Sequence, residues 1–131
     1  IFNQPIANYS KGFNYNWYEI PVIVTFESNW KKAKDLLITV IASYCESYED
    51  ELRRALKKAK KDYPINYTHI TPTIYTGTVD QGITLTLRYM VATRRIRESN
   101  HEIWEKILDI FDEHDDLELA YPTHRLINIK E

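Results

Sequence analysis

The stretch Thr71–Phe111 constrains the fold of this chain most, because its periodicity changes from that of a strand to that of a helix. Along its middle part, apolar residues alternate with polar or small ones: Ile83, Leu85, Leu87, Tyr89 and Val91. Successive side chains of a strand point to opposite faces of a sheet, so this pattern predicts a long strand with one buried face. The preceding run, Thr73–Val79, is rich in Thr, Ile, Tyr and Val, and residues 80–82 (Asp-Gln-Gly) separate the two. A short connection that contains Gly predicts an antiparallel hairpin.

The residues that follow this hairpin predict a helix. Ser99 and Glu102 have the spacing of a capping box, in which each side chain satisfies a free backbone N–H at a helix start. Apolar residues then recur at helical spacing: Ile103, Trp104, Ile107, Leu108 and Phe111. This stripe is typical of an amphipathic helix that packs on a sheet.

Length and composition limit the classes of protein that the chain can belong to. A chain of 131 residues buries one core, so we expect one compact domain with a small appendage. A net charge of −2 gives no overall attraction to nucleic acid or to an anionic membrane. The single cysteine, Cys45, cannot form an internal disulfide, which favours a reducing compartment. No run approaches the ~18 consecutive apolar residues of a membrane helix. A first residue Ile1 rather than Met suggests a fragment of a longer protein.

The first half of the chain predicts one strand and one long helix. Alternating apolar residues predict a strand over Tyr18–Phe26, and Ser28 or Asn29 is a suitable N-cap for the following helix. Helical periodicity then continues to Ala59, and no Gly or Pro interrupts this series before Pro64. A single helix of that length spans roughly 45–50 Å, whereas the strands of such a domain span ~20 Å.

The helix therefore either breaks near residues 46–50 or projects beyond the sheet. We predict projection, with basic residues on the solvated sides of the second half: Arg53, Arg54, Lys57, Lys58, Lys60 and Lys61. Such charges contribute little to folding when they are solvated.

The last part of the chain predicts one more strand and a tail. Leu117, Leu119 and Tyr121 alternate as a short strand, and Pro122 separates them from the β-prone segment Arg125–Lys130. The order strand–helix–strand–strand–helix–strand is that of a ferredoxin-like α+β sandwich. We expect this domain over residues 18–121. Residues 1–17, polar and rich in Asn, are expected to be the end of a preceding β-domain, and residues 122–131 a C-terminal β tail.

The search for catalytic or metal-binding patterns gives no constellation that would indicate an enzyme. His101 and Glu105 share a helix face but lack the HExxH pattern of a zinc site. The acidic run 109–116 lacks the spacing of a calcium loop, and three glycines form no phosphate-binding loop. Cys45 lies between Tyr44 and Tyr48 on a helix, where a buried small hydrophobe is the favoured interpretation. We therefore expect no enzyme, no cofactor and no metal.

Basic residues occur in two groups that raise the question of nucleic-acid binding. These are the run Arg53–Lys61 and the cluster Arg94, Arg95 and Arg97, and acidic residues adjoin both. Mixed charges on a helix indicate a solvated face with ion pairs, so we expect no nucleic-acid partner. An RNA-binding sandwich would instead place exposed aromatic residues at the centre of its open sheet face.

Several motifs resemble the region after the pore helix of small-conductance mechanosensitive ion channels. The most specific is Asn3-x-Pro5-Ile6-x-Asn8-Tyr9-Ser10-x-Gly12, followed by a strand that ends near residues 27–29. The strand with Leu87-Arg88-Tyr89, the helix with Trp104, and residues 119–123 (Leu-Ala-Tyr-Pro-Thr) resemble the rest of that cytosolic C-terminal region. The resemblance covers nearly the whole chain in order. Residues 48–67 are longer and more charged than the usual link, and the membrane helices are absent, so this chain cannot itself conduct.

The resemblance implies a homo-heptameric vestibule at the cytoplasmic face of the cell membrane, attached to the membrane through a part that precedes this chain. Side portals of such a vestibule pass ions and osmolytes, and the portal-region charges here would be Arg53, Arg54, Lys57 and Lys58. The segment after the Tyr-Pro turn would supply one strand per subunit to a small barrel, with oligomer contacts from Leu126, Ile127 and Ile129. A freestanding ferredoxin-like regulatory module that binds a small ligand remains the alternative, because a fold alone does not specify a function.

Overall fold

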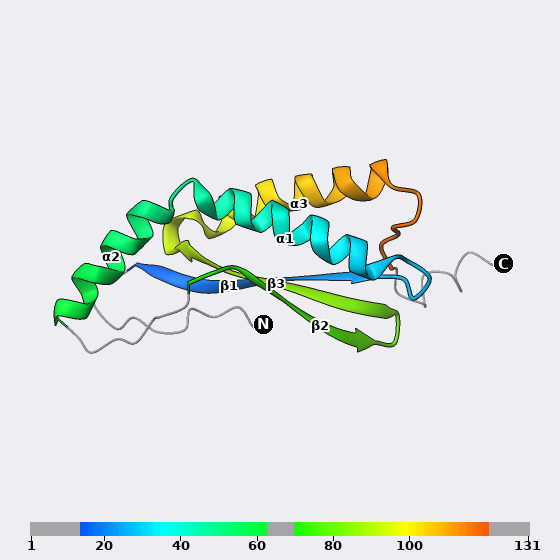
Figure 1. Cartoon of the computed structure of the whole chain (residues 1–131), viewed down its shortest axis with the longest axis horizontal. Helices are drawn as coiled ribbons and strands as arrows, with labels where there is room; N and C mark the ends of the chain where they lie inside the picture. Colours follow the sequence, from blue (N-terminus) through cyan, green and yellow to red (C-terminus); the bar gives the residue numbers. More distant parts are fainter. Residues whose placement is uncertain (1–13, 63–69, 121–131) are drawn as a thin grey trace.

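A three-stranded antiparallel sheet with two helices packed on one face forms the body of the protein (Figure 1). The computed structural model describes residues 14–62 and 70–120, apart from the side chains of residues 59–62. The elements in chain order are β1 (Tyr15–Val24), α1 (Trp30–Glu46), α2 (Glu49–Asp62), β2 (Thr73–Val79), β3 (Gly82–Ala92), the 3-10 turn η1 (Thr93–Arg95) and α3 (Ile96–Glu113). The described part is thus a small α+β domain with three α-helices.

The sheet has the order β1-β3-β2, with β3 in the centre. The predicted hairpin is confirmed: β2 pairs antiparallel with β3, and Val79 lies opposite Gly82 across the turn. β1 pairs antiparallel with the other side of β3 and places Ile20 opposite Leu87. β1 begins and ends earlier than the predicted strand Tyr18–Phe26, because the chain turns after Val24 and leaves Phe26 exposed.

The main core lies between the sheet and the pair of helices α1 and α3, which run side by side over it in Figure 1. Each strand contributes the side chains of one face, and the central strand contributes four that are fully buried: Leu85, Leu87, Tyr89 and Val91. The stripe predicted for α3 is only partly buried. Ile103 and Ile107 are fully buried, whereas the side chain of Leu108 is 51% exposed.

The predicted projection of the second half of the long helix is wrong. Asn29 does cap α1, because its side chain accepts a hydrogen bond from the backbone N–H of Lys32. However, α1 ends at Glu46, and a turn at residues 47–48 redirects the chain into α2. In Figure 1, α2 bends away from the axis of α1 at the end of the sheet where β1 begins.

The turn allows α2 to bury its apolar residues in a second cluster. Leu52 and Leu56 of α2 pack there with Tyr48, Ile70 and Met90. The same cluster explains why Met90 is buried although it lies on the sheet face opposite to α1 and α3. Burying two Leu side chains outweighs the helical hydrogen bonds lost at the turn, since each burial contributes about 1.5–3 kcal/mol.

The predicted capping box at the start of the second amphipathic helix is also wrong. α3 begins at Ile96, so Ser99 is inside the helix and is fully buried. The Ser99 hydroxyl lies 2.7 Å from the hydroxyl of Tyr89 and donates to the carbonyl of Ile96 at 2.9 Å. A buried tyrosine hydroxyl needs a hydrogen-bond partner, and Ser99 supplies it instead of capping a helix.

The last described residues lie along the outer edge of β1. Leu119 forms an isolated antiparallel bridge with Val24, and two backbone hydrogen bonds flank it, from Thr25 N–H to Glu118 O and from Ala120 N–H to Ile23 O. The predicted final strand is therefore represented by a single bridge within the described residues. Residues 121–131 and 1–13, with their predicted barrel strand and end of a β-domain, lie outside the described residues. Among the described helices, none is both long and apolar enough to cross a membrane.

Candidate functional site

A groove between α1, α2 and the chain that enters β2 has a volume of about 520 Å³. It exists because α2 turns away from α1 and because Ile70 returns the chain beneath them. Apolar side chains form most of its wall: Ile38, Ala42, Cys45, Leu52, Ile70, Pro72 and Met90. Polar residues complete the lining: Thr39, Ser43, Glu46, Glu49, Arg53 and Thr71.

The charged residues of the groove differ in how they are paired. The guanidinium of Arg53 donates two hydrogen bonds to Oε2 of Glu49, at 2.8 and 3.0 Å. Glu46 is exposed and takes part in none of the ion pairs found among the described residues. The groove therefore carries one carboxylate without an ionic partner and one cation that is already neutralised.

Cys45 contributes its thiol to the same groove. Burial raises the pKa of this thiol from an ordinary 9.0 to about 11, although a hydrogen bond with Tyr48 acts in the opposite direction. A thiol with so high a pKa is almost entirely protonated at neutral pH and is a poor nucleophile. Cys45 was predicted to be a buried small hydrophobe, and the structure buries it only partly.

The sheet face opposite α1 and α3 carries a small polar and aromatic group. Arg88 of the central strand lies over the ring of Trp17, 4.5 Å from its centroid, and pairs with Glu19 at 3.2 Å. Tyr75, 56% exposed, lies on the edge strand opposite Thr86. The central strand of this face therefore carries threonine and a paired arginine, flanked by Trp17 of β1 and Tyr75 of β2.

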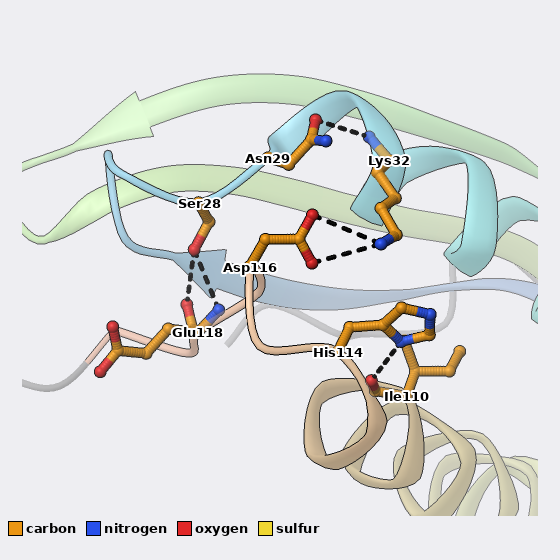
Figure 2. Close-up of polar contacts among 7 residues, drawn as sticks. All are labelled: Ser28, Asn29, Lys32, Ile110, His114, Asp116 and Glu118. Atoms are coloured by element: carbon orange, nitrogen blue, oxygen red, sulfur yellow. Dashed lines mark hydrogen bonds and ion pairs between the residues drawn. The ribbon is translucent and has the colours of Figure 1, made fainter.

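A network of polar contacts holds the segment after α3 against the start of α1 (Figure 2). The Ser28 hydroxyl accepts a hydrogen bond from the backbone N–H of Glu118 at 2.9 Å and donates to its carbonyl at 3.3 Å. Lys32 pairs with the carboxylate of Asp116 at 3.3 Å, and the backbone N–H of Asn29 donates to the carbonyl of Asp116. These contacts hold residues 116–118 against the start of α1.

The same figure shows how α3 ends. Nδ1 of His114 donates to the carbonyl oxygen of Ile110 at 2.9 Å, so the ring satisfies a backbone group of the last turn. Slight desolvation raises the pKa of Asp116, but hydrogen bonds from Lys32 and the backbone outweigh it and lower that pKa below its ordinary value. These groups serve the structure of the loop and do not converge on a cavity.

The predicted site residues fall into two groups. The basic residues expected near a portal all have exposed side chains on α2: Arg53, Arg54, Lys57 and Lys58. The residues expected to form oligomer contacts, Leu126, Ile127 and Ile129, lie outside the described residues. Nε2 of His101 lies 3.4 Å from Glu105 on α3, and no group of three or more potential metal ligands occurs within residues 14–62 and 70–120.

Sequence patterns did not reveal the groove, because the turn that creates it contains neither Gly nor Pro. A local signal is present at residues 46–51, where Glu46 and Ser47 are followed by three acidic residues that suit a helix start, Glu49, Asp50 and Glu51. Comparison with protein-family models and with curated proteins found no match to this chain.

Proposed function

We propose that this chain is the cytosolic vestibule domain of a small-conductance mechanosensitive ion channel and acts within a homo-oligomer. The observation that carries the proposal is the ordered series of motifs described above, which begins with the Asn-Pro-Asn-Tyr-Ser-Gly pattern of residues 3–12. The later motifs belong to the main elements of the domain, since residues 87–89 are in β3 and Trp104 is in α3. The proposed role is structural and non-enzymatic.

A ferredoxin-like arrangement is part of this proposal. The bridge between Leu119 and Val24 supports it, because it runs antiparallel along the edge of β1 that β3 does not occupy. A strand that continued this bridge would give the order β4-β1-β3-β2, with both α1 and α3 on one face.

The outer edge of β2 supports assembly with other copies. β2 is uncharged and contains no proline, and its exposed residues include Tyr75 and Val79. Edge strands of proteins that must stay apart are usually protected by charges, proline or bulges. An unprotected edge is therefore consistent with burial in a larger assembly.

The complete assembly would be a heptamer at the cytoplasmic face of the membrane, joined to it by a preceding part of the protein. The segment Arg125–Lys130 has apolar residues on both sides when extended, with Ile127 and Ile129 on one and Leu126 on the other. A ring of such strands pairs every backbone edge and buries an apolar face. The role of residues 122–131 as a barrel strand is therefore part of the same proposal.

The test uses the longer protein that contains this chain. Membrane patches that contain it are expected to show currents gated by tension, and deletion of residues from His124 onward is expected to weaken the heptamer while α/β domains stay folded. Sedimentation of the intact and truncated proteins measures the oligomer, and circular dichroism measures the fold. Absence of tension-gated current from correctly inserted protein would count against the proposal.

A second candidate function is that of a freestanding ferredoxin-like regulatory module that binds a small ligand. The groove between α1 and α2 favours it, because its volume lies in the range of small-molecule sites. The two candidates differ in assembly. A monomeric protein that regulates a partner in response to a ligand fits the second, whereas a membrane-attached ring fits the first.

A further inference from the structure

We infer that the groove between α1 and α2 binds a small amphipathic cation, with an apolar chain in the groove and an ammonium group beside Glu46. This inference goes beyond the proposed vestibule function and does not depend on it. Ligand sites of proteins are concave, have volumes of about 300–1,000 Å³ and are mostly apolar with few polar groups. The groove, at about 520 Å³, has these properties.

The wall of the groove determines the apolar part of the ligand. Ile38 and Ala42 of α1 and Leu52 of α2 line the groove together with Ile70 and Met90, and the last two pack with Leu52 in the second core cluster. Leu52 and Met90 are 3% and 1% exposed, so they form a closed floor beneath the open space. An alkyl chain or a flat apolar group placed here removes apolar surface of both partners from water, at about 25 cal/mol per Å².

The charges of the groove determine the sign of the polar part. Arg53 is held by two hydrogen bonds from its guanidinium to Glu49, so an anionic ligand would have to compete with that carboxylate. Glu46 has no ionic partner among the described residues, and it lines the groove next to Cys45. A cationic head group therefore gains an ion pair without breaking one.

The arrangement favours an organic cation over a metal ion. No group of three or more His, Cys, Asp or Glu residues gathers as a metal site anywhere in residues 14–62 and 70–120. A single free carboxylate with an apolar wall matches a quaternary alkylammonium, whose charge is spread over its methyl groups and weakly hydrated. A bound ligand would contact both α1 and α2 and would therefore stabilise their relative orientation across the turn at residues 47–48.

The experiment uses the whole chain and three probes with the same alkyl chain: octyltrimethylammonium, octanol and octyl sulfate. Calorimetry measures affinity, and the alkylation rate of Cys45, the only cysteine, reports occupancy of the groove. All probes are used well below the concentrations at which they form micelles. We expect octyltrimethylammonium to bind one site, to slow alkylation of Cys45, and to bind more tightly than octanol, with octyl sulfate the weakest.

Two variants and a control locate the site. Glu46→Gln is expected to weaken binding of the cation by about two- to five-fold and to leave the affinity for octanol unchanged, as for an exposed ion pair. Glu113→Gln, at the exposed end of α3, is the matched control and should change neither affinity. Ala42→Trp, at an exposed position of the lining, is expected to fill the groove and remove binding of all three probes.

Three results would overturn the inference. They are equal affinity for octyltrimethylammonium and octyl sulfate, unchanged cation affinity in Glu46→Gln, and unchanged alkylation of Cys45 at saturating cation. Because these measurements need no membrane and no oligomer, a negative result leaves the proposed channel function standing. Loss of tension-gated current in the longer protein would likewise leave the ligand site standing.

Discussion

The hydroxyl of Tyr48 donates a hydrogen bond of 2.5 Å to the backbone carbonyl of Met90, which fastens the turn between α1 and α2 to the central strand. The ring of Tyr48 also packs against Tyr44 and Tyr15, with ring centroids 5.7 and 6.4 Å apart. Burial raises the pKa of Tyr48 far above its ordinary value, so the hydroxyl is protonated and able to donate at neutral pH. The second core cluster is organised around this residue.

Tyr48→Phe is expected to lower the free energy of unfolding by about 1–3 kcal/mol, because the Met90 carbonyl would lose a buried donor. Tyr75→Phe is the matched control, since the side chain of Tyr75 is 56% exposed. Its effect is expected to stay within about 0.5 kcal/mol. Chemical denaturation of the two variants measures the difference, and equal stabilities would mean that the hydrogen bond contributes nothing.

Leu52→Ala is expected to destabilise the protein by about 2–4 kcal/mol, because it leaves a cavity in the cluster with Leu56 and Met90. Leu108→Ala removes the same atoms from a side chain that is 51% exposed and should cost well under about 1 kcal/mol. Chemical denaturation of both variants, analysed with a common m-value, gives the midpoints from which their stabilities are compared. If Leu52→Ala destabilised the protein as little as Leu108→Ala, the result would instead support a helix whose second half projects from the domain.

Cys45 is expected to react slowly with a neutral alkylating reagent at pH 8, because the pKa of its thiol is raised to about 11. The folded state favours the protonated thiol. The associated stability is present in full below the ordinary pKa of 9.0 and is lost as the pH rises towards 11. As the pH rises from 9.0 to about 11, the free energy of unfolding should therefore fall further in the wild-type protein than in Cys45→Ala. Parallel pH dependences of the two proteins would contradict the burial of the thiol.

Ser28→Ala is expected to cost about 1–3 kcal/mol, because the backbone N–H of Glu118 would lose its hydrogen-bond acceptor. Ser43→Ala, at an exposed position of α1, is the control and should be close to neutral. Hydrogen exchange of residues 117–120 should become faster in Ser28→Ala alone. Unchanged exchange there would show that Asp116 and Lys32 are sufficient to hold the segment.

Reversing the charges of Lys57 and Lys58 is expected to change the free energy of unfolding by less than about 1 kcal/mol, because both side chains are exposed. In the proposed channel, the same double variant should shift the preference between anions and cations. Reversal potentials under a salt gradient measure that preference, and the double reversal of Arg94 and Arg95, two exposed residues of η1, provides a control of equal charge. An unchanged reversal potential in the Lys57 and Lys58 variant would remove these residues from the conduction pathway.

Local patterns determined much of this protein. Alternation along β3 predicted its buried face, residues 80–82 predicted the hairpin, and Asn29 was among the predicted caps of α1. Each of these features depends on interactions between residues close in the chain, such as a turn, a cap or the two-residue repeat of a strand. The expectation of a small α+β domain followed from their order.

Tertiary structure alone decided the rest. The periodicity of the long helix continues past Ser47, so contacts of Tyr48, Leu52 and Leu56 with Met90 select a turn over a straight helix. Ser99 has the spacing of a cap, but the buried hydroxyl of Tyr89 requires it as a partner inside α3. The groove follows from that turn and from the return of the chain at Ile70. Such choices depend on residues far apart in the chain, whose burial and hydrogen bonds exist only once the sheet and helices have come together.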